Sequence, residues 1–284
     1  MINRMAPYLF LGCLILTLLA LGCEEAPPPV VEAPVEEAPA KAKPGDMVLI
    51  PAGEFTMGTD ENPAAGGLAY ASPAHLVKME KPYYIDVYEV TNGQWSKFLI
   101  ETKFRPEGDW RRYYSIGKED YPVANVTWDD AKAYCEHIDG RLPTEAEWER
   151  AARGPENSIF PWGDKYDPSK SNCNEMGYKD TVEVGRFEAD KSGYGVYDTM
   201  GNLQEWTSEK LKPYRKSPVP RGDPTFRRGY ISARGGSYAM KGSSMPLYTR
   251  AAYLPKSQYG IGFRCVKDSE EEIAASEDKP KSEN

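Results

Sequence analysis

The strongest constraint on the fold is the lack of helical periodicity in the second half of the chain. After Gly154 no apolar repeat is long enough for an extended helix, and glycines, prolines and aromatic residues alternate with short strand-like runs such as residues 230–234. The 24 prolines and 25 glycines indicate many turns and short elements, not a helical bundle. Since both ends of the 284 residues are biased in composition, we expect one folded domain.

Three helices are predicted in the first half, each beginning after a threonine. They should end near residues 101, 138 and 154, and Thr91, Thr127 and Thr144 supply their caps. The third start is the clearest, because Thr144 and Glu147 have capping-box spacing. Short strands are expected at residues 47–50, 54–57, 76–79 and 83–88, the first two joined at residues 51–53. The predicted class is therefore α+β, rich in loops.

Both ends of the chain are predicted to lie outside this domain. An apolar run over residues 9–21 follows Arg4 and is too short for a comfortable membrane span, so residues 1–22 are read as a signal peptide. The run ends Leu-Ala-Leu-Gly-Cys, which resembles the lipobox of bacterial lipoproteins with Cys23 as the lipidated residue; an ordinary signal peptide is the alternative. Residues 23–46 are expected to form a disordered tether, residues 47–267 the domain, and residues 268–284 a disordered charged tail.

Charge and location point to a cell-envelope protein. The net charge of −8 and the expected lack of any basic cluster argue against nucleic acid as a partner. Glu24 is not the aspartate that favours inner-membrane retention in enterobacterial lipoproteins, so the outer membrane is the expected anchor. The membrane would be reached through the lipid on Cys23.

One turn-forming stretch, residues 194–206, carries two carboxylates that are candidate cation ligands. Asp198 and Glu205 flank the turn signal Gly201-Asn202, beside aromatic residues that would exclude water. Two close carboxylates either share a proton or hold a cation, and calcium accepts the carbonyl oxygens that irregular turns leave free. A plain turn with solvated acids is the alternative on spacing alone.

Several motifs together resemble one family. They are Met-Val-Leu-Ile-Pro-Ala-Gly from residue 47, Glu-Val-Thr from 89, Tyr-Pro-Val from 121, Trp-Asp-Asp-Ala from 128, Arg-Leu-Pro-Thr-Glu-Ala-Glu-Trp-Glu from 141, Pro-Trp-Gly from 161, Arg-Gly-Gly-Ser from 234, and Gly-Phe-Arg-Cys from 262. With residues 194–206, they resemble the formylglycine-generating enzyme, or sulfatase-modifying factor, domain over residues 47–266. The resemblance implies a variant of the C-type-lectin fold.

The resemblance also implies calcium sites. Family members carry calcium in a loop that matches the side chains of Asp198 and Glu205 and the carbonyls of Gly201 and Leu203. A second family position would fall on Asn172 and on the carbonyls of Cys173 and Tyr178. Its acidic ligand aligns with Met176, which cannot bind calcium, and Glu175 would have to substitute with a small shift.

The catalytic positions depart from the family pattern. Aerobic members use two cysteines, five residues apart, that bind copper, and the matching positions here are Met245 and Arg250. A thioether is a weak ligand and an arginine repels a cation, so neither copper binding nor formylglycine formation is expected. A related iron-dependent chemistry would require His75 and His137 to meet, and Cys173 is either a lone nucleophile or a packed thiol.

Only three thiols remain after export and lipidation, so at most one internal disulfide can form. The resemblance implies that Cys135 pairs with Cys265 and leaves Cys173 free. The predicted function is a calcium-stabilised binding module for a peptide, a protein or an envelope polymer. The competing prediction is an oxidoreductase of the same superfamily that uses different chemistry on an unknown substrate.

Overall fold

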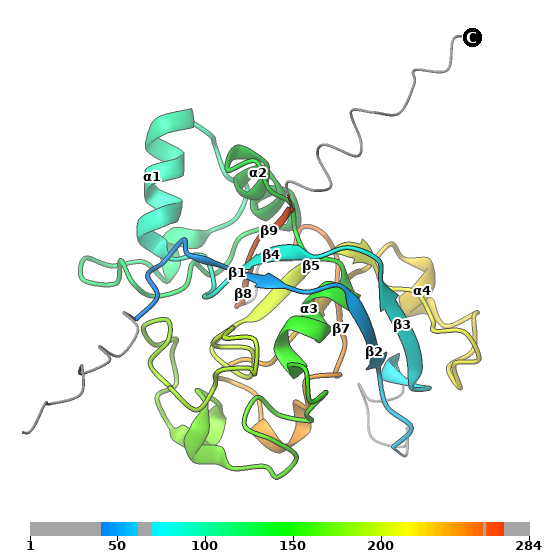
Figure 1. Ribbon diagram of the computed structural model, residues 1–284. Helices are drawn as coiled ribbons and strands as arrows, with labels where there is room; N and C mark the ends of the chain where they lie inside the picture. The colour runs from blue at the N-terminus through cyan, green and yellow to red at the C-terminus, as the bar shows by residue number, and fades with distance from the viewer. Residues whose placement is uncertain (1–40, 62–69, 258–259, 270–284) are drawn as a thin grey trace, which may run out of the picture. The chain divides into compact units, whose positions relative to one another are not determined.

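A computed structural model describes residues 41–61, 70–257 and 260–269, and Figure 1 shows the arrangement of its elements. The α-helices are α1 (Asn92–Thr102), α2 (Trp128–His137), α3 (Glu145–Arg153) and the short α4 (Pro224–Arg227). Single 3-10 turns occur at η2 (Trp110–Arg112), η3 (Pro168–Lys170), η4 (Asn174–Met176) and η5 (Gly242–Ser244). None of the helices in the described ranges has the length and hydrophobicity needed to span a bilayer.

The strands are short and form three separate sheets. They are β1 (Met47–Ile50), β2 (Gly53–Met57), β3 (His75–Met79), β4 (Tyr83–Asp86), β5 (Gln204–Lys210), β6 (Ile231–Arg234), β7 (Ala251–Tyr253), β8 (Ile261–Gly262) and β9 (Val266–Asp268). The sheet orders are β1-β4-β9, β2-β3 and β7-β6-β5-β8, and all pairs are antiparallel except β5 with β8. The mixed α+β prediction is confirmed.

The three predicted helix starts are confirmed with their caps. Thr91, Thr127 and Thr144 each accept a hydrogen bond from the backbone three residues ahead, and each is part of a capping box. The side chain at the third helical position accepts a hydrogen bond from the backbone N–H of the threonine. Two otherwise unpaired amide groups are therefore satisfied at every helix start. These interactions are local, which explains why the sequence revealed them.

The boundaries of the domain differ from the prediction at both ends. Lys41 Nζ donates to the Gly185 carbonyl, and Val87 N donates to the Asp46 carbonyl, so residues 41–46 are part of the fold and not of a tether. At the other end, Asp268 lies in β9 and pairs with Arg141 at 2.7 Å. The predicted signal peptide, Cys23, the rest of the predicted tether and residues 270–284 lie outside the described residues.

The two predicted strands joined at residues 51–53 are present as β1 and β2, and the link between them runs from one sheet to another. Strand β1 pairs with β4, whereas β2 pairs with β3 in another sheet. The link crosses between sheets, where the Arg150 guanidinium donates to the carbonyls of Pro51 and Glu54 at 3.0 and 3.1 Å. A long-range side chain therefore fixes the crossing, which local sequence cannot reveal.

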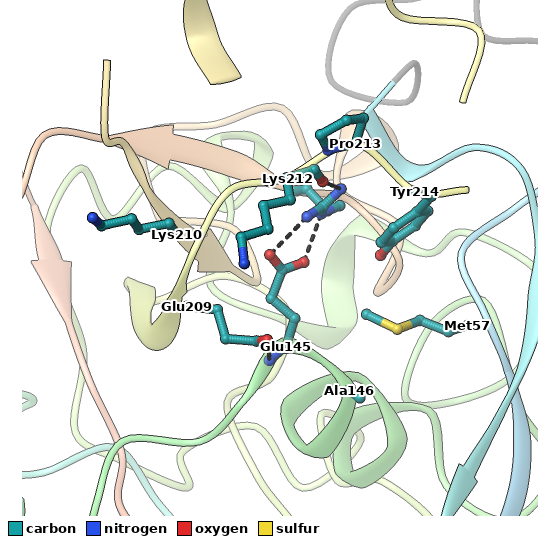
Figure 2. Close-up of a pocket in the computed structure, with 9 residues that line it drawn as sticks. Met57, Glu145, Ala146, Glu209, Lys210, Lys212, Pro213 and Tyr214 are labelled. Atoms are coloured by element: carbon teal, nitrogen blue, oxygen red, sulfur yellow. Dashed lines mark hydrogen bonds and ion pairs between the residues drawn. The ribbon is translucent and has the colours of Figure 1, made fainter. Parts of the chain in front are cut away.

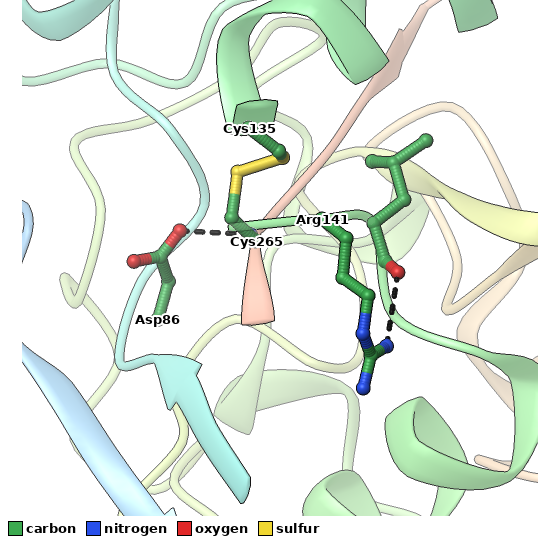
Figure 3. Close-up of a disulfide and its surroundings, with 5 residues drawn as sticks. Asp86, Cys135, Arg141 and Cys265 are labelled. Atoms are coloured by element: carbon green, nitrogen blue, oxygen red, sulfur yellow. Dashed lines mark hydrogen bonds between the residues drawn. A yellow bond between two sulfur atoms is a disulfide. The ribbon is translucent and has the colours of Figure 1, made fainter. Parts of the chain in front are cut away.

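The main apolar cluster lies between α1, α2 and the β5–β8 pair. Its aromatic rings include Trp95, Tyr134 and Phe263, with the Tyr134 and Phe263 centroids 5.4 Å apart. Beside it, Cys135 of α2 and Cys265 form a disulfide with a Cα–Cα distance of 5.5 Å (Figure 3). The pairing implied by the family resemblance is therefore present, and Cys173 is free and buried.

Candidate functional site

The turn that leads into β5 has an unusual backbone that glycine and asparagine make possible. Asp198, Gly201 and Asn202 all have positive φ angles, of 55°, 103° and 53°. A Cβ atom on Gly201 would lie 2.3 Å from the Asn172 carbonyl oxygen, so no other residue fits there. Asn202 N also donates to that carbonyl at 2.9 Å. The turn is thus closed against the segment that begins at Asn172.

Glu205 is the most strongly bound carboxylate of this turn. The guanidinium of Arg264 donates to both of its oxygens at 2.7 Å, and the indole N–H of Trp148 donates to Oε2 at 2.8 Å. All three side chains are completely or almost completely buried. Three charge-assisted or polar bonds therefore hold Glu205 in position at the start of β5.

Other buried carboxyls around this turn lack such a partner. Glu89, Asp190 and Asp198 form no ion pair in the described part of the chain, and they accept bonds from backbone N–H groups or the Asn202 amide. Burial, and then the charge of Asp198, raises the pKa of Glu89 and of Asp190 well above the usual range. Burial also raises the pKa of Asp198 to about 7. If all of these groups were ionised, their negative charge would exceed what Arg264 alone can compensate, and the raised pKa values follow from this.

The types of donor near this turn are those that calcium prefers. Buried carboxyls that are crowded together must bind either protons or a cation, and calcium prefers an all-oxygen environment. Asp198 lies in the turn, where its Oδ2 accepts the Gly185 N–H at 2.6 Å, whereas Glu205 lies in β5 with both oxygens already bound to Arg264 and Trp148. In the residues that the structure describes, no group of three or more His, Cys, Asp or Glu side chains is arranged to hold a metal. The expected site has two such side chains and two carbonyls.

The second expected calcium position fits less well. The Asn172 side-chain oxygen is buried without a hydrogen-bond partner, as a cation ligand would be in the absence of its ion. However, the Cys173 carbonyl accepts the Met176 N–H at 3.0 Å, and Tyr178 is 42% exposed. The Glu175 carboxylate accepts the Tyr166 hydroxyl and the Gly242 N–H, so it is committed elsewhere and does not replace the missing acid.

Arg250, one of the two positions that match family cysteines, is a buried structural residue. Its Nε and Nη2 atoms donate to the two carboxylate oxygens of Glu145 at 2.6 and 2.7 Å, and Nη1 donates to the carbonyls of Tyr70 and Lys212. The Tyr214 ring lies 4.2 Å from the guanidinium carbon. Burial opposes ionisation of Glu145, but Arg250 and then Arg234 hold its pKa below the usual value.

Met245, the other matching position, is completely buried in the second apolar cluster with Trp148, Met200 and Cys173. Its sulfur lies where the side chain of residue 236 would otherwise be, since a Cβ on Gly236 would come within 1.9 Å of it. The position that carries a thiol in the family is thus filled by an apolar side chain packed against the Arg-Gly-Gly-Ser turn.

A pocket of about 210 Å³ opens beside Arg250 (Figure 2). Its walls come from β2, the first turn of α3, the end of β5 and the segment after it, and the residues are Met57, Glu145, Ala146, Glu209, Lys210, Lys212, Pro213, Tyr214 and Arg250. Glu209 accepts the Glu145 N–H at 2.8 Å, which ties β5 to the start of α3. The rim therefore carries both acidic and basic side chains.

The structure does not bring the other catalytic candidates together. His75 lies against Tyr214, whereas His137 lies beside Phe98 and 3.6 Å from Glu101, so the two histidines are in different parts of the fold. Cys173 is 1% exposed, and its sulfur is 3.7 Å from the Tyr166 hydroxyl oxygen. It is a packed thiol, in agreement with the less reactive of its two interpretations.

Sequence reasoning missed the acidic partners of both sites. Glu145 was recognised only as part of a helix start, and Glu89 only as part of a motif, although both lie in the quoted family stretches. The presence of both acids within family stretches is a signal from which their burial could have been predicted. The pocket residues Glu209, Lys210 and Tyr214 had no local signal of that kind.

Comparison with known proteins agrees with the motifs. Residues 32–269 match the sulfatase-modifying factor enzyme 1-like domain. The formylglycine-generating enzyme of Bos taurus is 31% identical, with 79% of this chain and 75% of that protein covered. The inactive C-alpha-formylglycine-generating enzyme 2 of Bos taurus is also 31% identical, with 78% and 87% covered.

A solved structure extends the agreement to the fold. That of PvdO from Pseudomonas aeruginosa is 27% identical, has a TM-score of 0.66, and covers 81% of this chain and 100% of its own. The expected fold, the α+β variant of the C-type-lectin fold found in formylglycine-generating enzymes, is confirmed. By its sequence and its architecture, the chain belongs to the sulfatase-modifying factor enzyme 1-like domain family.

Proposed function

We propose that the chain is an exported lipoprotein whose domain binds a peptide, a protein segment or an envelope polymer without chemical conversion. The observation that carries this proposal is the burial and the hydrogen bonding of Arg250. Its guanidinium is 4% exposed, and its bonds go to Glu145 and to two backbone carbonyls, so it fills a family cysteine position without offering reactive chemistry. The pocket beside it is the expected ligand site.

Loss of the family reaction is supported at both matching positions. The reaction requires thiolates, and neither a buried thioether at Met245 nor a guanidinium at Arg250 can replace them. A relative of equal identity to this chain carries the word inactive in its name, so a member without the reaction has a precedent.

Calcium is proposed as a structural ion in this protein. The side chains of Asp198 and Glu205, with the carbonyls of Gly201 and Leu203, would hold it at the turn before β5. The ion would neutralise part of the buried negative charge and fix the turn. A weaker site would use Asn172, with the carbonyls of Cys173 and Tyr178; its support is the unpartnered Asn172 oxygen.

The location is proposed from the sequence. Lipid on Cys23 would anchor the mature chain to the envelope, with the outer membrane favoured over the inner. Mass spectrometry of the membrane fraction should show a diacylglyceryl-sized addition on Cys23, and Cys23→Ser should release the protein. A serine variant that stays in the membrane contradicts the anchor.

The alternative is an oxidoreductase with different chemistry. Its candidate nucleophile, Cys173, is 1% exposed and buried in an apolar cluster with Met245 and Trp148, so a substrate has no access to its sulfur. Copper-dependent oxygen consumption with a thiol peptide would support the enzyme, whereas retention of calcium alone supports a binding module.

The proposal can be tested by pairing a turnover assay with ligand selection. The mature chain should convert no cysteine in a sulfatase-type peptide to formylglycine, with or without copper. Peptides selected from a random library on the immobilised chain should lose at least about tenfold in affinity in Ala146→Trp, which fills the pocket. Ala52→Trp, at an exposed alanine outside the pocket, is the control. Copper-dependent turnover, or selected peptides indifferent to Ala146→Trp, would refute the proposed function.

A further inference from the structure

Residues 210–228, called here the basic segment, carry an unusual charge for this protein. The stretch holds seven Lys or Arg residues (210, 212, 215, 216, 221, 227 and 228) and one acid, Asp223, for a net charge of +6 (7 − 1). The whole chain has a net charge of −8, so the remainder carries −14 (−8 − 6). The expectation that the chain lacks a basic cluster is therefore wrong, because the composition of residues 210–228 shows one.

Six of the seven cations of the basic segment have no side-chain partner among the described residues. The side chains of Lys210, Lys212, Arg215, Lys216, Arg221 and Arg228 are all exposed. Within the part of the chain that the structure describes, none of these six forms an ion pair or donates a side-chain hydrogen bond. By contrast, the lysines within α1 and α2 pair locally, Lys97 with Glu101 and Lys132 with Glu136. Unpaired cations in one segment indicate a surface for a negatively charged partner.

The segment is held in place by its aromatic residues and its backbone. It connects β5 to β6 and includes α4, beside the β2-β3 sheet in Figure 1. The Tyr214 ring contacts His75 of β3 at 4.5 Å between centroids, and Phe226 contacts Tyr70 at 5.6 Å. The Lys212 carbonyl accepts a bond from Arg250. The cations therefore project from a positioned backbone and need little ordering to bind.

The pocket at the start of the basic segment narrows the class of partner. Its rim combines the Glu209 carboxylate with the ammonium groups of Lys210 and Lys212. A phosphate backbone offers no N–H donor to the Glu209 carboxylate, and a flat lipid surface would not enter the pocket. A peptide supplies N–H donors for the glutamate and side-chain carboxylates for the lysines.

We propose that an acidic peptide segment of a partner protein binds along the basic segment, with its carboxylates paired to the cations of residues 210–228. This inference rests on the proposed binding function, and it specifies the ligand class for that pocket. The peptide begins in the pocket beside Lys210 and Lys212 and continues over Arg215, Lys216, Arg221 and Arg228.

The probe is a fluorescent twelve-residue peptide of alternating glutamate and glycine, with a glutamine-glycine peptide of the same length for comparison. Anisotropy should show binding of the acidic peptide to the mature chain at 50 mM NaCl, and much weaker binding at 300 mM, because exposed pairs are screened by salt. The glutamine peptide should not bind. Equal binding of both peptides would overturn the inference.

A matched pair of variants locates the binding. The first replaces Arg215, Lys216, Arg221 and Arg228 with glutamine. The control replaces Lys97, Lys103, Arg105 and Lys132, which are exposed on the α1 and α2 side and give the same change in charge. Exposed ion pairs are worth roughly twofold to fivefold each, so the first variant should lose at least about tenfold in affinity and the control almost nothing.

The outcomes separate this inference from the proposed function. Equal losses in both variants would show an unspecific charge effect and overturn the inference, while Ala146→Trp would still report on the pocket. Loss in the basic-segment variant without loss in Ala146→Trp would refute the pocket as the start of the peptide site and overturn that part of the inference, while it would still assign acidic-peptide binding to the four cations. A twelve-nucleotide single-stranded DNA or vesicles with 30% phosphatidylserine that bind tighter than the peptide, and depend on the same four cations, would assign the surface to another partner. Unchanged melting temperatures confirm that all variants are folded.

Discussion

Replacing Arg250 with methionine should destabilise the fold strongly. The change removes two short hydrogen bonds to Glu145 and two to backbone carbonyls, and it leaves Glu145, whose side chain is 5% exposed, with Arg234 at 3.6 Å. Breaking one half of a buried pair costs about 3–5 kcal/mol, because the remaining charge stays in the interior. For a domain of this size, that corresponds to a fall in melting temperature of roughly 6–20 °C.

Urea denaturation of Arg250→Met, Glu145→Gln and the double variant measures the effect. The double variant should recover at least about 1 kcal/mol over the sum of the single losses, since the buried charge is then gone. Arg221→Met, at an exposed and unpaired arginine, should change stability by less than about 0.5 kcal/mol.

The pH dependence gives an independent check on the same pair. Because Arg250 and Arg234 hold the pKa of Glu145 below its usual value, the pair stabilises the fold above that value and the contribution is lost as the pH falls. The deficit of Arg250→Met should therefore shrink below about pH 4. An additive double variant, or a deficit that does not change with pH, would refute the assignment of Arg250 as a structural counter-ion.

Three further predictions concern the disulfide, calcium and pH. Replacing both Cys135 and Cys265 with alanine should lower the free energy of unfolding by about 2–5 kcal/mol, because the bridge closes a loop of 130 positions; equal urea midpoints for variant and wild type would contradict this. Calcium at a hundredfold excess over its dissociation constant should stabilise the wild type by about 2.7 kcal/mol, and Asp198→Asn or Glu205→Gln should abolish this response to chelator; identical wild-type melting curves with calcium and with chelator would exclude the site. Burial raises the pKa of Asp86 from 3.8 to about 7, so the folded state binds the proton of this carboxyl more tightly than the unfolded state does. The free energy of unfolding should therefore fall as the pH rises from 4 to 7, by up to about 4 kcal/mol. Asp86→Asn should flatten that slope, and an unchanged slope would show that other groups cause it.

Local patterns explain most of what the sequence predicted correctly. The three threonine caps act within four residues, and short strands bounded by turn residues are visible without any partner. The Cys135–Cys265 pair was accessible only through family resemblance, because 130 positions separate the two thiols. Nothing within the helix-start pattern indicated that Glu145 would bind a side chain 105 positions away.

Other parts of the fold depend on side chains that act at long range. Arg150 and Arg153 of α3 donate to backbone carbonyls of the first strands, so irregular segments are satisfied by guanidinium groups and not only by sheet ladders. Such contacts follow no sequence period, so the sequence did not indicate that β1 and β2 belong to different sheets. The basic segment is a different case, since its composition could be read directly from the sequence.

The order β1-β4-β9 has a consequence for the time at which folding can finish. Strand β4 is flanked by the first strand of the fold and by the last, so this sheet cannot be completed until Val266–Asp268 have been made. Cys265 and Arg264 arrive at the same moment, and with them the bridge to α2 and the counter-ion for Glu205. A chain synthesised from its N-terminus therefore cannot complete this sheet until nearly the end of the described residues. Contacts of such long sequence separation slow folding, because the entropic cost of closing a long loop is met before the contact forms.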